Sequence, residues 1–314
     1  MLRSNRQVWT TEELGFVCPS CRRPLLRRDL GWECVQENFS FAISQGIPDL
    51  VLPSRRERID TFLSIYQKIR STEGWGSTNV DYYLSLPYRD LTGNHRRIWK
   101  TRARTFERFF YQLAERNQST PLRLLDVGAG NCWMSIRLAD AGWLVVAADI
   151  NMDSFDGLGV AFRLGTKGPL KFSCVRAEFD YLPFPESSFD VIVFNASLHY
   201  SKDTTATLLR ALRLIKDDGA LYILDSPLYQ DGESGKKMVE ERRGEYRKKY
   251  GISIPDEFAG NFLTYEQLDR LQPQCTLESL SPHYGMVWNL RPVLARLLSR
   301  REPASFEIVI LRKI

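Results

Sequence analysis

The pattern of apolar and polar positions divides the chain into three parts. Residues 16–53 carry short apolar stretches separated by polar turns, which predicts a small β-rich module. Over residues 54–69 and 96–116 apolar side chains recur every three or four positions, which predicts two amphipathic helices. The segment between them, 71–94, reads as a loop rich in aromatic residues. Such a loop suits either the cap of a pocket or packing in the core.

From residue 121 onward, apolar strand-like stretches alternate with helical ones. The strand-like stretches are 122–127, 143–150, 172–175, 191–195, 220–225, 275–281 and 306–311, and the helical ones are 132–141, 153–164, 204–215 and a basic segment at 290–300. Nearly continuous apolar strands between helices predict an α/β fold whose parallel sheet is covered on both faces. We therefore expect three parts, at residues 1–53, 54–118 and 119–314.

Composition narrows the class of protein. The chain has 314 residues, of which 43% are hydrophobic and 26% charged, as in ordinary folded proteins. No apolar run approaches the ~20 residues that span a bilayer, and no secretory or lipidation signal is visible. The six cysteines do not resemble a disulfide framework. We expect a cytoplasmic protein with reduced or metal-bound thiols, without a membrane partner.

Charge is unevenly distributed. The formal net charge is +5, and residues 1–118 hold 19 Lys and Arg against 13 Asp and Glu, a net of +6. A basic front third suits RNA or an anionic substrate. The excess is mild for a dedicated nucleic-acid binder.

A glycine-rich turn follows the strand-like stretch 122–127. Its sequence is Leu124-Leu-Asp-Val-Gly-Ala-Gly130, which lets backbone N–H groups approach a ligand closely. A dinucleotide fingerprint needs a third glycine where this chain has Trp133. Asp126, two residues before Gly128, would repel a diphosphate and suits a cofactor with a cationic amino group.

A second carboxylate completes the pattern. Asp149 ends the next strand-like stretch, where it can accept hydrogen bonds from a ribose diol. Together, Asp126, Gly128, Gly130 and Asp149 resemble the motifs of the class I S-adenosylmethionine-dependent methyltransferases. That resemblance implies a Rossmann-like sheet of seven strands whose last strand is antiparallel.

Three further segments resemble the same family in the same order. Residues 177–190 are similar to its G-D-A-x-x-L-P-F-x-x-x-S-F-D segment, and this implies that Glu178 binds the adenine amino group. Asn195-Ala-Ser-Leu-His199 is similar to the segment after strand four, which implies that Asn195 contacts the cofactor. Residues 212–219 resemble the turn before strand five, with Asp217 and Asp218 where Pro and Gly are usual.

His199 is the candidate catalytic base. It follows strand four at the carboxyl edge of the sheet, where open α/β folds place their ligands, and its ordinary pKa is near 6.5. Packing beside the cofactor is the alternative role for this side chain. Residues 225–229 follow strand five, and we expect them to border the same cleft.

Three cysteines form a candidate metal site. Cys18 and Cys21 are spaced as a zinc knuckle, and Cys34 supplies a third thiolate. A second knuckle would place the fourth ligand at position 37, where this chain has Glu37 in place of a cysteine. The sequence is therefore compatible with a zinc site and with a site that has lost its metal. Residues 16–52 resemble the zinc-ribbon modules that precede some RNA, protein and small-molecule methyltransferases.

The sequence thus predicts an S-adenosylmethionine-dependent methyltransferase. A small-molecule acceptor is favoured because the aromatic segment suits a cap. An RNA base methyltransferase, ribosomal or transfer, is the first alternative, and a non-catalytic cofactor-binding partner or regulator is the second. The Asn-Pro-Pro-Tyr-like sequence that suits amino-methylation of bases is missing after strand four. The acceptor atom and the oligomeric state are not encoded in any motif.

Overall fold

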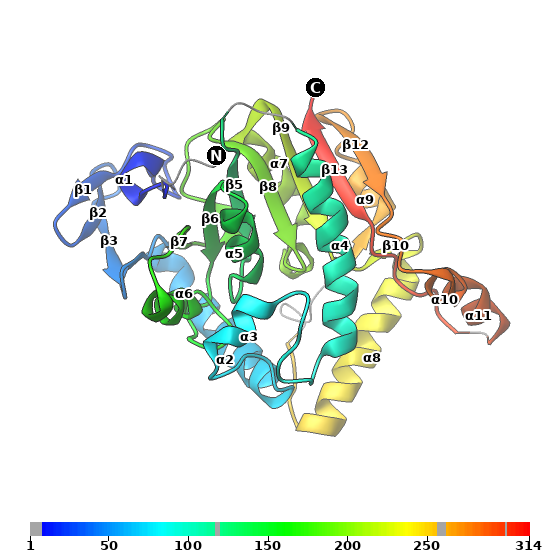
Figure 1. Cartoon of the computed structure of the whole chain (residues 1–314). Helices are drawn as coiled ribbons and strands as arrows, with labels where there is room; N and C mark the ends of the chain where they lie inside the picture. The colour runs from blue at the N-terminus through cyan, green and yellow to red at the C-terminus, as the bar shows by residue number, and fades with distance from the viewer. Residues whose placement is uncertain (1–7, 117–119, 256–261, 299) are drawn as a thin grey trace, which may run out of the picture.

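The computed structural model describes residues 8–116, 120–255, 262–298 and 300–314 (Figure 1). Its centre is a seven-stranded sheet with the order β12-β13-β9-β8-β5-β6-β7. The strands are β5 (Arg123–Val127), β6 (Leu144–Asp149), β7 (Ser173–Arg176), β8 (Phe189–Asn195), β9 (Ile215–Leu224), β12 (Cys275–Leu280) and β13 (Ile308–Lys313). β5 to β9 run parallel, whereas β13 is antiparallel to both of its neighbours. The Rossmann-like sheet with an antiparallel last strand is confirmed.

Helices cover both faces of this sheet. The main ones are α2 (Arg56–Thr72), α3 (Val80–Ser85), α4 (Arg96–Ala114), α5 (Trp133–Asp140), α6 (Gly159–Leu164), α7 (Thr204–Leu214), α8 (Gly232–Tyr250) and α9 (Tyr265–Asp269). Along β8, Val191 and Val193 join the apolar cluster under α4 and α5, whereas Ile192 and Phe194 join the cluster under α7. Because successive side chains of a strand point to opposite faces, β8 needs apolar residues at every position.

The N-terminal part is a small β module, as its sequence predicted. β1 (Leu26–Arg28), β2 (Gly31–Cys34), β3 (Phe39–Ser44) and β4 (Ile47–Pro48) form an antiparallel sheet. The module is fastened to the large sheet by backbone bonds. Val17 donates to the carbonyl of Pro183 (3.0 Å), and Leu50 donates to that of Arg176 in β7 (2.9 Å).

A buried carboxylate joins the module to the sheet. Asp49 accepts hydrogen bonds from Arg176 of β7 (3.0 Å) and from Arg56 at the start of α2 (2.9 Å). The end of the module and the start of α2 therefore meet the distant strand β7 at one side chain, which is 6% exposed.

Two expectations about local structure were wrong. Helix 153–164 is only α6, because Asp153 accepts hydrogen bonds from the backbone of Phe155 and Asp156 and so holds a turn. The segment 71–94 contains α3, whose Tyr82 and Tyr83 are buried in the core. The expected helix 290–300 is present as α11 (Arg291–Leu297), and a further short helix, α10 (Met286–Asn289), precedes it.

The pair α10 and α11 projects from the body of the molecule (Figure 1). Large apolar side chains on it are exposed, among them Met286 and Val287, each 82% exposed. Among the described residues, no helix is long and apolar enough to cross a membrane.

The position of Asp49 leads to a test of stability. Asp49→Asn leaves Arg176 without its buried counter-charge, and we expect it to lower the free energy of unfolding by about 2–4 kcal/mol. The matched control is Asp60→Asn, because Asp60 also faces Arg176 (3.6 Å) but is 68% exposed. That variant should cost less than about 1 kcal/mol in urea unfolding. Equal losses in the two variants would contradict the role given to Asp49.

Candidate functional site

The turn between β5 and α5 packs tightly against the loop after β8. Gly128 has a φ of +72°, and a Cβ added there would lie 2.3 Å from the Cβ of Ser197. The N–H groups of Gly128 and Ala129 both donate to the carbonyl of Ala148 (2.8 and 3.2 Å). The predicted turn is therefore held from two neighbouring strands, and only glycine fits its first position.

The backbone is strained at three loops along this edge of the sheet. Cys132 after β5, Ala196 after β8 and Asp225 after β9 have φ values of 61°, 53° and 49°. Left-handed conformations in residues other than glycine are uncommon and concentrate at functional sites. Their grouping along one edge marks that edge as the site.

Asp126 is buried at the end of β5 with one oxygen unsatisfied. Its Oδ2 accepts a hydrogen bond from Ser135 (2.7 Å), whereas its Oδ1 has no hydrogen-bond partner among the described residues. Burial, with a smaller contribution from the charge of Asp149, raises the pKa of Asp126 to about 7. A buried carboxylate oxygen at a cavity wall suits a cationic ligand group.

Asp149 and Glu178 lie at the ends of β6 and β7. Asp149 accepts hydrogen bonds from the backbone of Gly130 (2.8 Å) and Asn151 (2.7 Å), so it also braces the glycine turn. Burial raises its pKa. Glu178 forms a two-pronged ion pair with Arg55 (2.6 and 3.0 Å). Its neighbours in the chain line the pocket described next, whereas its own carboxylate is turned toward Arg55.

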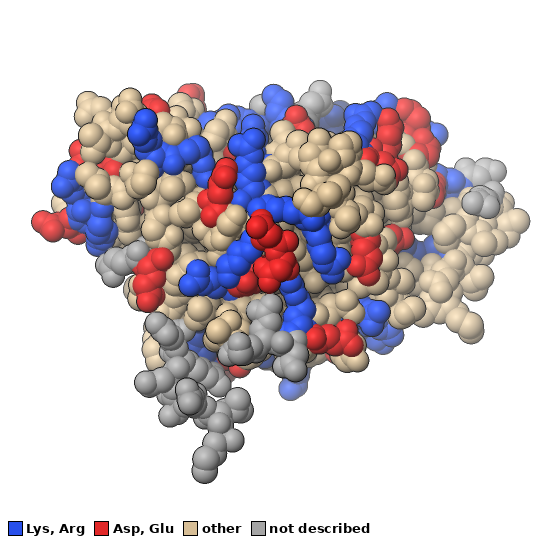
Figure 2. Space-filling view, turned by 90° about the horizontal axis from the view of Figure 1, so that it is seen from above, with Lys and Arg blue, Asp and Glu red and all other residues tan. Residues whose placement is uncertain are grey.

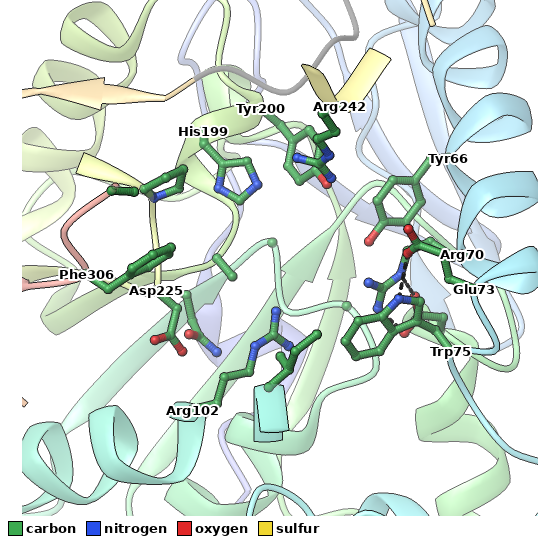
Figure 3. Close-up of a pocket in the computed structure, with 18 of the residues that line it drawn as sticks. Tyr66, Arg70, Glu73, Trp75, Arg102, His199, Tyr200, Asp225, Arg242 and Phe306 are labelled. Carbon is green, nitrogen blue, oxygen red and sulfur yellow. Dashed lines mark hydrogen bonds and ion pairs between the residues drawn. The ribbon is translucent and has the colours of Figure 1, made fainter. Parts of the chain in front are cut away.

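Two adjoining cavities open over the turn. A cavity of about 600 Å³ reaches from Gly128 and Asn195 to α2, α4 and α8, and a smaller pocket of about 80 Å³ holds Asp149, Ala177 and Phe179. Both share the turn as a wall. Figure 3 shows side chains that face the larger cavity from opposite sides: Tyr66, Arg70, Glu73, Trp75, Arg102, His199, Tyr200, Asp225, Arg242 and Phe306.

Predicted border residues do line the larger cavity. Asp225, Pro227 and Tyr229 all contribute to its wall, as expected for the loop after β9. Of the aromatic segment 71–94, Trp75 reaches the cavity and stacks on the guanidinium of Arg70, whose Cζ lies 3.8 Å from the ring centroid. The segment caps the site with Trp75 and supports the core with Tyr82 and Tyr83, whereas Tyr88 is exposed.

His199 lies in the short 3-10 turn Leu198–Tyr200, directly after β8. Its ring is buried against the cavity, and its Nδ1 has no hydrogen-bond partner in the described part of the chain. Burial, followed by the positive charges of Arg242 and Arg102, lowers the pKa of His199 to about 3. The imidazole is therefore neutral at physiological pH.

Arg102 on α4 and Arg242 on α8 are site residues that the sequence motifs did not identify. Arg102 lies three residues after Trp99 and four before Phe106, so a charge interrupts a buried apolar stripe. Arg242 precedes Tyr246 by four residues in the same way. Both line the cavity, and a charge on the inward stripe of a helix is the signal that marks them.

The three predicted thiol ligands are brought together. The sulfur atoms of Cys18, Cys21 and Cys34 lie within 4.8 Å of one another, with 3.5 Å between those of Cys21 and Cys34. Glu37 is adjacent, since its backbone N–H donates to the sulfur of Cys34 (3.4 Å).

Comparison with known families now identifies the class of the central domain. Residues 125–223 match the family described as "Methyltransferase domain". These residues hold β5 to β9 and the loops that line the cavity. Residues 125–223 are thus similar to the methyltransferase domain that the sequence motifs predicted.

Individual proteins similar to this chain are methyltransferases. The ubiquinone/menaquinone biosynthesis C-methyltransferase UbiE of Azotobacter vinelandii is 31% identical over 140 residues, or 43% of this chain and 51% of that protein. The demethylmenaquinone methyltransferase of Clavibacter sepedonicus is 29% identical over 149 residues, covering 47% and 56%. The chain spans about half the length of these curated relatives.

Among solved structures, the PH0226 protein of Pyrococcus horikoshii OT3 is similar at 17% identity with a TM-score of 0.45. The similarity covers 74% of this chain and 99% of that one.

The residues present fit S-adenosylmethionine. The unsatisfied oxygen of Asp126 suits the α-ammonium group, and the turn is open at Gly130, where nothing lies within 4 Å of an added Cβ. The pocket at Asp149, Ala177 and Phe179 supplies a carboxylate and apolar walls for an adenosine.

The raised pKa of Asp126 leads to a test of pH dependence. Because the folded state disfavours the ionised carboxylate, the protein loses stability as pH rises from about 4 to 7, by about 4 kcal/mol at most. Asp126→Asn lacks this loss, so its stability relative to the unmodified protein should rise between pH 5 and pH 8 in urea unfolding. Asp217→Asn, at a 99% exposed side chain, is the control and should show no such trend. A pH-independent difference for Asp126→Asn would contradict the assignment.

Proposed function

We propose that the protein transfers a methyl group from S-adenosylmethionine to a small molecule bound in the larger cavity. The observation that carries this proposal is the cavity itself. It adjoins the glycine turn, has a volume of about 600 Å³, and is walled by residues of α2, α4 and α8 as well as the sheet. Ligand pockets for small molecules have this size and enclosure.

Each proposed cofactor residue contacts a different part of S-adenosylmethionine. Asp126 holds the ammonium group, Gly128 and Gly130 admit the methionine part, and Asp149 accepts from the ribose. Glu178 is the proposed contact to the adenine amino group. Asn195 is a proposed contact to the part of the cofactor that lies nearest the end of β8. When bound, S-adenosylmethionine supplies an electrophilic methyl group for an in-line displacement.

For this displacement, the protein has to align the acceptor with the methyl group and exclude water. Tyr66 and Tyr200, whose rings meet edge to face at 5.9 Å, line both cavities and suit the junction between cofactor and acceptor. His199 is the proposed proton acceptor. Its neutral imidazole faces the cavity, although the adjacent positive charges make it a weak base while the acceptor site is empty.

The named relatives support a small-molecule acceptor. Both are named for methyl transfer in quinone biosynthesis. Aromatic walls at Tyr66, Trp75, Tyr200 and Phe306 suit a ring-containing acceptor in this chain also.

The alternatives of an RNA acceptor and a non-catalytic partner have less support. On the face shown in Figure 2, Lys and Arg side chains are interspersed with Asp and Glu, whereas an RNA footprint is typically a basic stripe. Binding to bulk RNA that weakens steeply with salt would favour the first alternative. Bound cofactor that never turns over with any acceptor would favour the second.

We also propose that Cys18, Cys21 and Cys34 hold a zinc ion in a ribbon-like module. Tetrahedral Zn–S bonds of about 2.3 Å place thiolate sulfurs about 3.8 Å apart, close to the observed cluster. The carboxylate of Glu37 lies outside this cluster of three sulfur atoms, so the proposed fourth ligand is a water molecule or a reoriented Glu37 side chain. The proposed division of the chain is a module at 1–53, a cap at 54–118 and the methyltransferase domain at 119–314.

The cofactor site is tested by calorimetric titration of S-adenosylhomocysteine. We expect binding to the unmodified protein, no binding of NAD(H), and a loss of more than about 100-fold in Gly128→Ala, where the new methyl group meets Ser197. Asp149→Ala should lose binding as well. Gly165→Ala is the control, since nothing lies within 4 Å of a Cβ there. Unchanged affinity in the first two variants would refute the cofactor site.

The metal site is tested by elemental analysis of the purified chain. We expect about one zinc per chain, and less than half of that in Cys21→Ser. Cys275→Ser is the control, because this buried cysteine lies in β12, outside the cluster. Zinc-free protein with unchanged stability after chelation would contradict the proposal.

A further inference from the structure

The charges lining the larger cavity do not balance locally. The charged lining residues are five arginines (Arg70, Arg102, Arg242, Arg291 and Arg301) and four carboxylates (Glu73, Asp126, Asp156 and Asp225). Asp156 is paired with Arg70, whereas the other three carboxylates accept hydrogen bonds from uncharged side chains of the protein. S-Adenosylmethionine adds a sulfonium, an ammonium and one carboxylate, and so makes the cavity more positive still.

Four of the five arginines donate to acceptors of the protein, and the fourth, Arg242, donates only to a hydroxyl group. Arg70 is paired with Asp156, and Arg301 with Glu241 (2.7 Å). Arg291 donates to the carbonyl of Ala304 (2.9 Å). These contacts hold the three guanidinium groups in the wall of the cavity.

Arg102 is different, since no acceptor among the described residues takes a hydrogen bond from its guanidinium. Its Cζ lies 5.1 Å from the ring of Trp99 and 5.6 Å from that of Trp75. Stacking on aromatic rings holds the group in place but leaves its five N–H donors unused. The nearby carboxylate of Asp225 is fixed by Thr105 (2.8 Å).

Arg242 approaches from α8, on the other side of the cavity (Figure 3). Its Nε donates to the hydroxyl of Tyr246 (3.2 Å), and its charge lies beside Tyr200. The charges of Arg102 and Arg242 both lower the pKa of His199, which carries no charge of its own at neutral pH. In Figure 3, His199 lies on the same side of the cavity as Tyr200 and Arg242, with Arg102 across from them. Among the described residues, no carboxylate is hydrogen-bonded to either guanidinium, so both cations are available to an anionic ligand near the neutral imidazole.

We propose that the methyl acceptor is an anion whose carboxylate, or chemically similar oxyanion, lies between Arg102 and Arg242 beside His199. This inference rests on the proposed function and names the chemistry of its acceptor. Guanidinium groups bind carboxylates through paired hydrogen bonds, and partial burial strengthens such bonds. The aromatic walls favour a ring attached to the anionic group.

The same arrangement links acceptor binding to the base. An anion between the two arginines offsets the charges that disfavour protonation of His199. The imidazole then becomes a stronger proton acceptor only when the acceptor is in place. Asp225 and Asp126 also line the cavity, but each is already hydrogen-bonded to a hydroxyl group of the protein. The bound anion is therefore the group that changes the charge around His199.

Benzoate and benzamide are the probes, because they share a shape and differ in charge. Calorimetric titration into the full chain, with and without saturating S-adenosylhomocysteine, should show benzoate binding at least about tenfold tighter than benzamide. Arg102→Met and Arg242→Met should each weaken benzoate binding by about tenfold or more, with Lys at either position giving an intermediate loss. Arg97→Met on α4 and Arg247→Met on α8, both at exposed positions, are the controls.

Each other outcome has a defined meaning. Equal binding of the two probes, no saturable benzoate binding, or binding that survives both Met variants overturns the proposal. If Arg102→Met weakens S-adenosylhomocysteine but not 5′-methylthioadenosine, Arg102 holds the cofactor's own carboxylate and the proposal fails for that residue. If S-adenosylhomocysteine does not bind the unmodified protein, the proposed function fails, and benzoate binding to the free protein still decides the anion site.

A spectroscopic measurement separates recognition from a structural role of the arginines. The chain has three histidines, so the imidazole signals can be assigned by substitution. Saturating benzoate should raise the pKa of His199 in nuclear magnetic resonance titrations, while benzamide should leave it unchanged. A pKa that does not respond to benzoate would contradict the link between the anion and His199.

Discussion

The site depends on the close contact between two loops that leave neighbouring parallel strands. The turn after β5 and the loop after β8 meet at Gly128 and Ser197, with no room for a side chain at the glycine. Ser197 also donates to the carbonyl of Val127 (2.6 Å), which ties the end of β5 to the same loop. Because parallel strands present their carboxyl ends at one edge, this single contact fixes the floor on which the ligand groups converge.

The sequence was sufficient for the sheet and for the position of the motif residues at its edge. Continuous apolar strands between helices predicted the parallel sheet, and the ordered motifs predicted Asp126, Gly128 and Asp149 at its edge. These features are local, since each residue follows a strand whose end is readable from the chain. Glu178 was placed by its motif, but the motif does not reveal Arg55, which lies more than a hundred residues earlier.

The acceptor half was harder to predict because its residues come from helices outside the motifs. Arg102 and Arg242 meet across the cavity only after α4 and α8 have packed at the sheet edge. The pKa of His199 has the same origin, since burial and two distant charges set it. The helix expected at 153–164 failed for a local reason, because side-chain to backbone bonds at Asp153 replaced a helical turn.

The attachment of the N-terminal module at β7 also bears on association between copies of the chain. β7 is an edge strand of the seven-stranded sheet. If it were uncovered, its unpaired backbone groups could bind any other β segment. The residues after β4 run beside it, pair Asp49 with Arg176, and take up the carbonyl of Arg176. The N-terminal module therefore covers the edge of the seven-stranded sheet and keeps β7 from pairing with another chain. This is a reason for the two to remain in one polypeptide whether or not the cysteine cluster carries a metal.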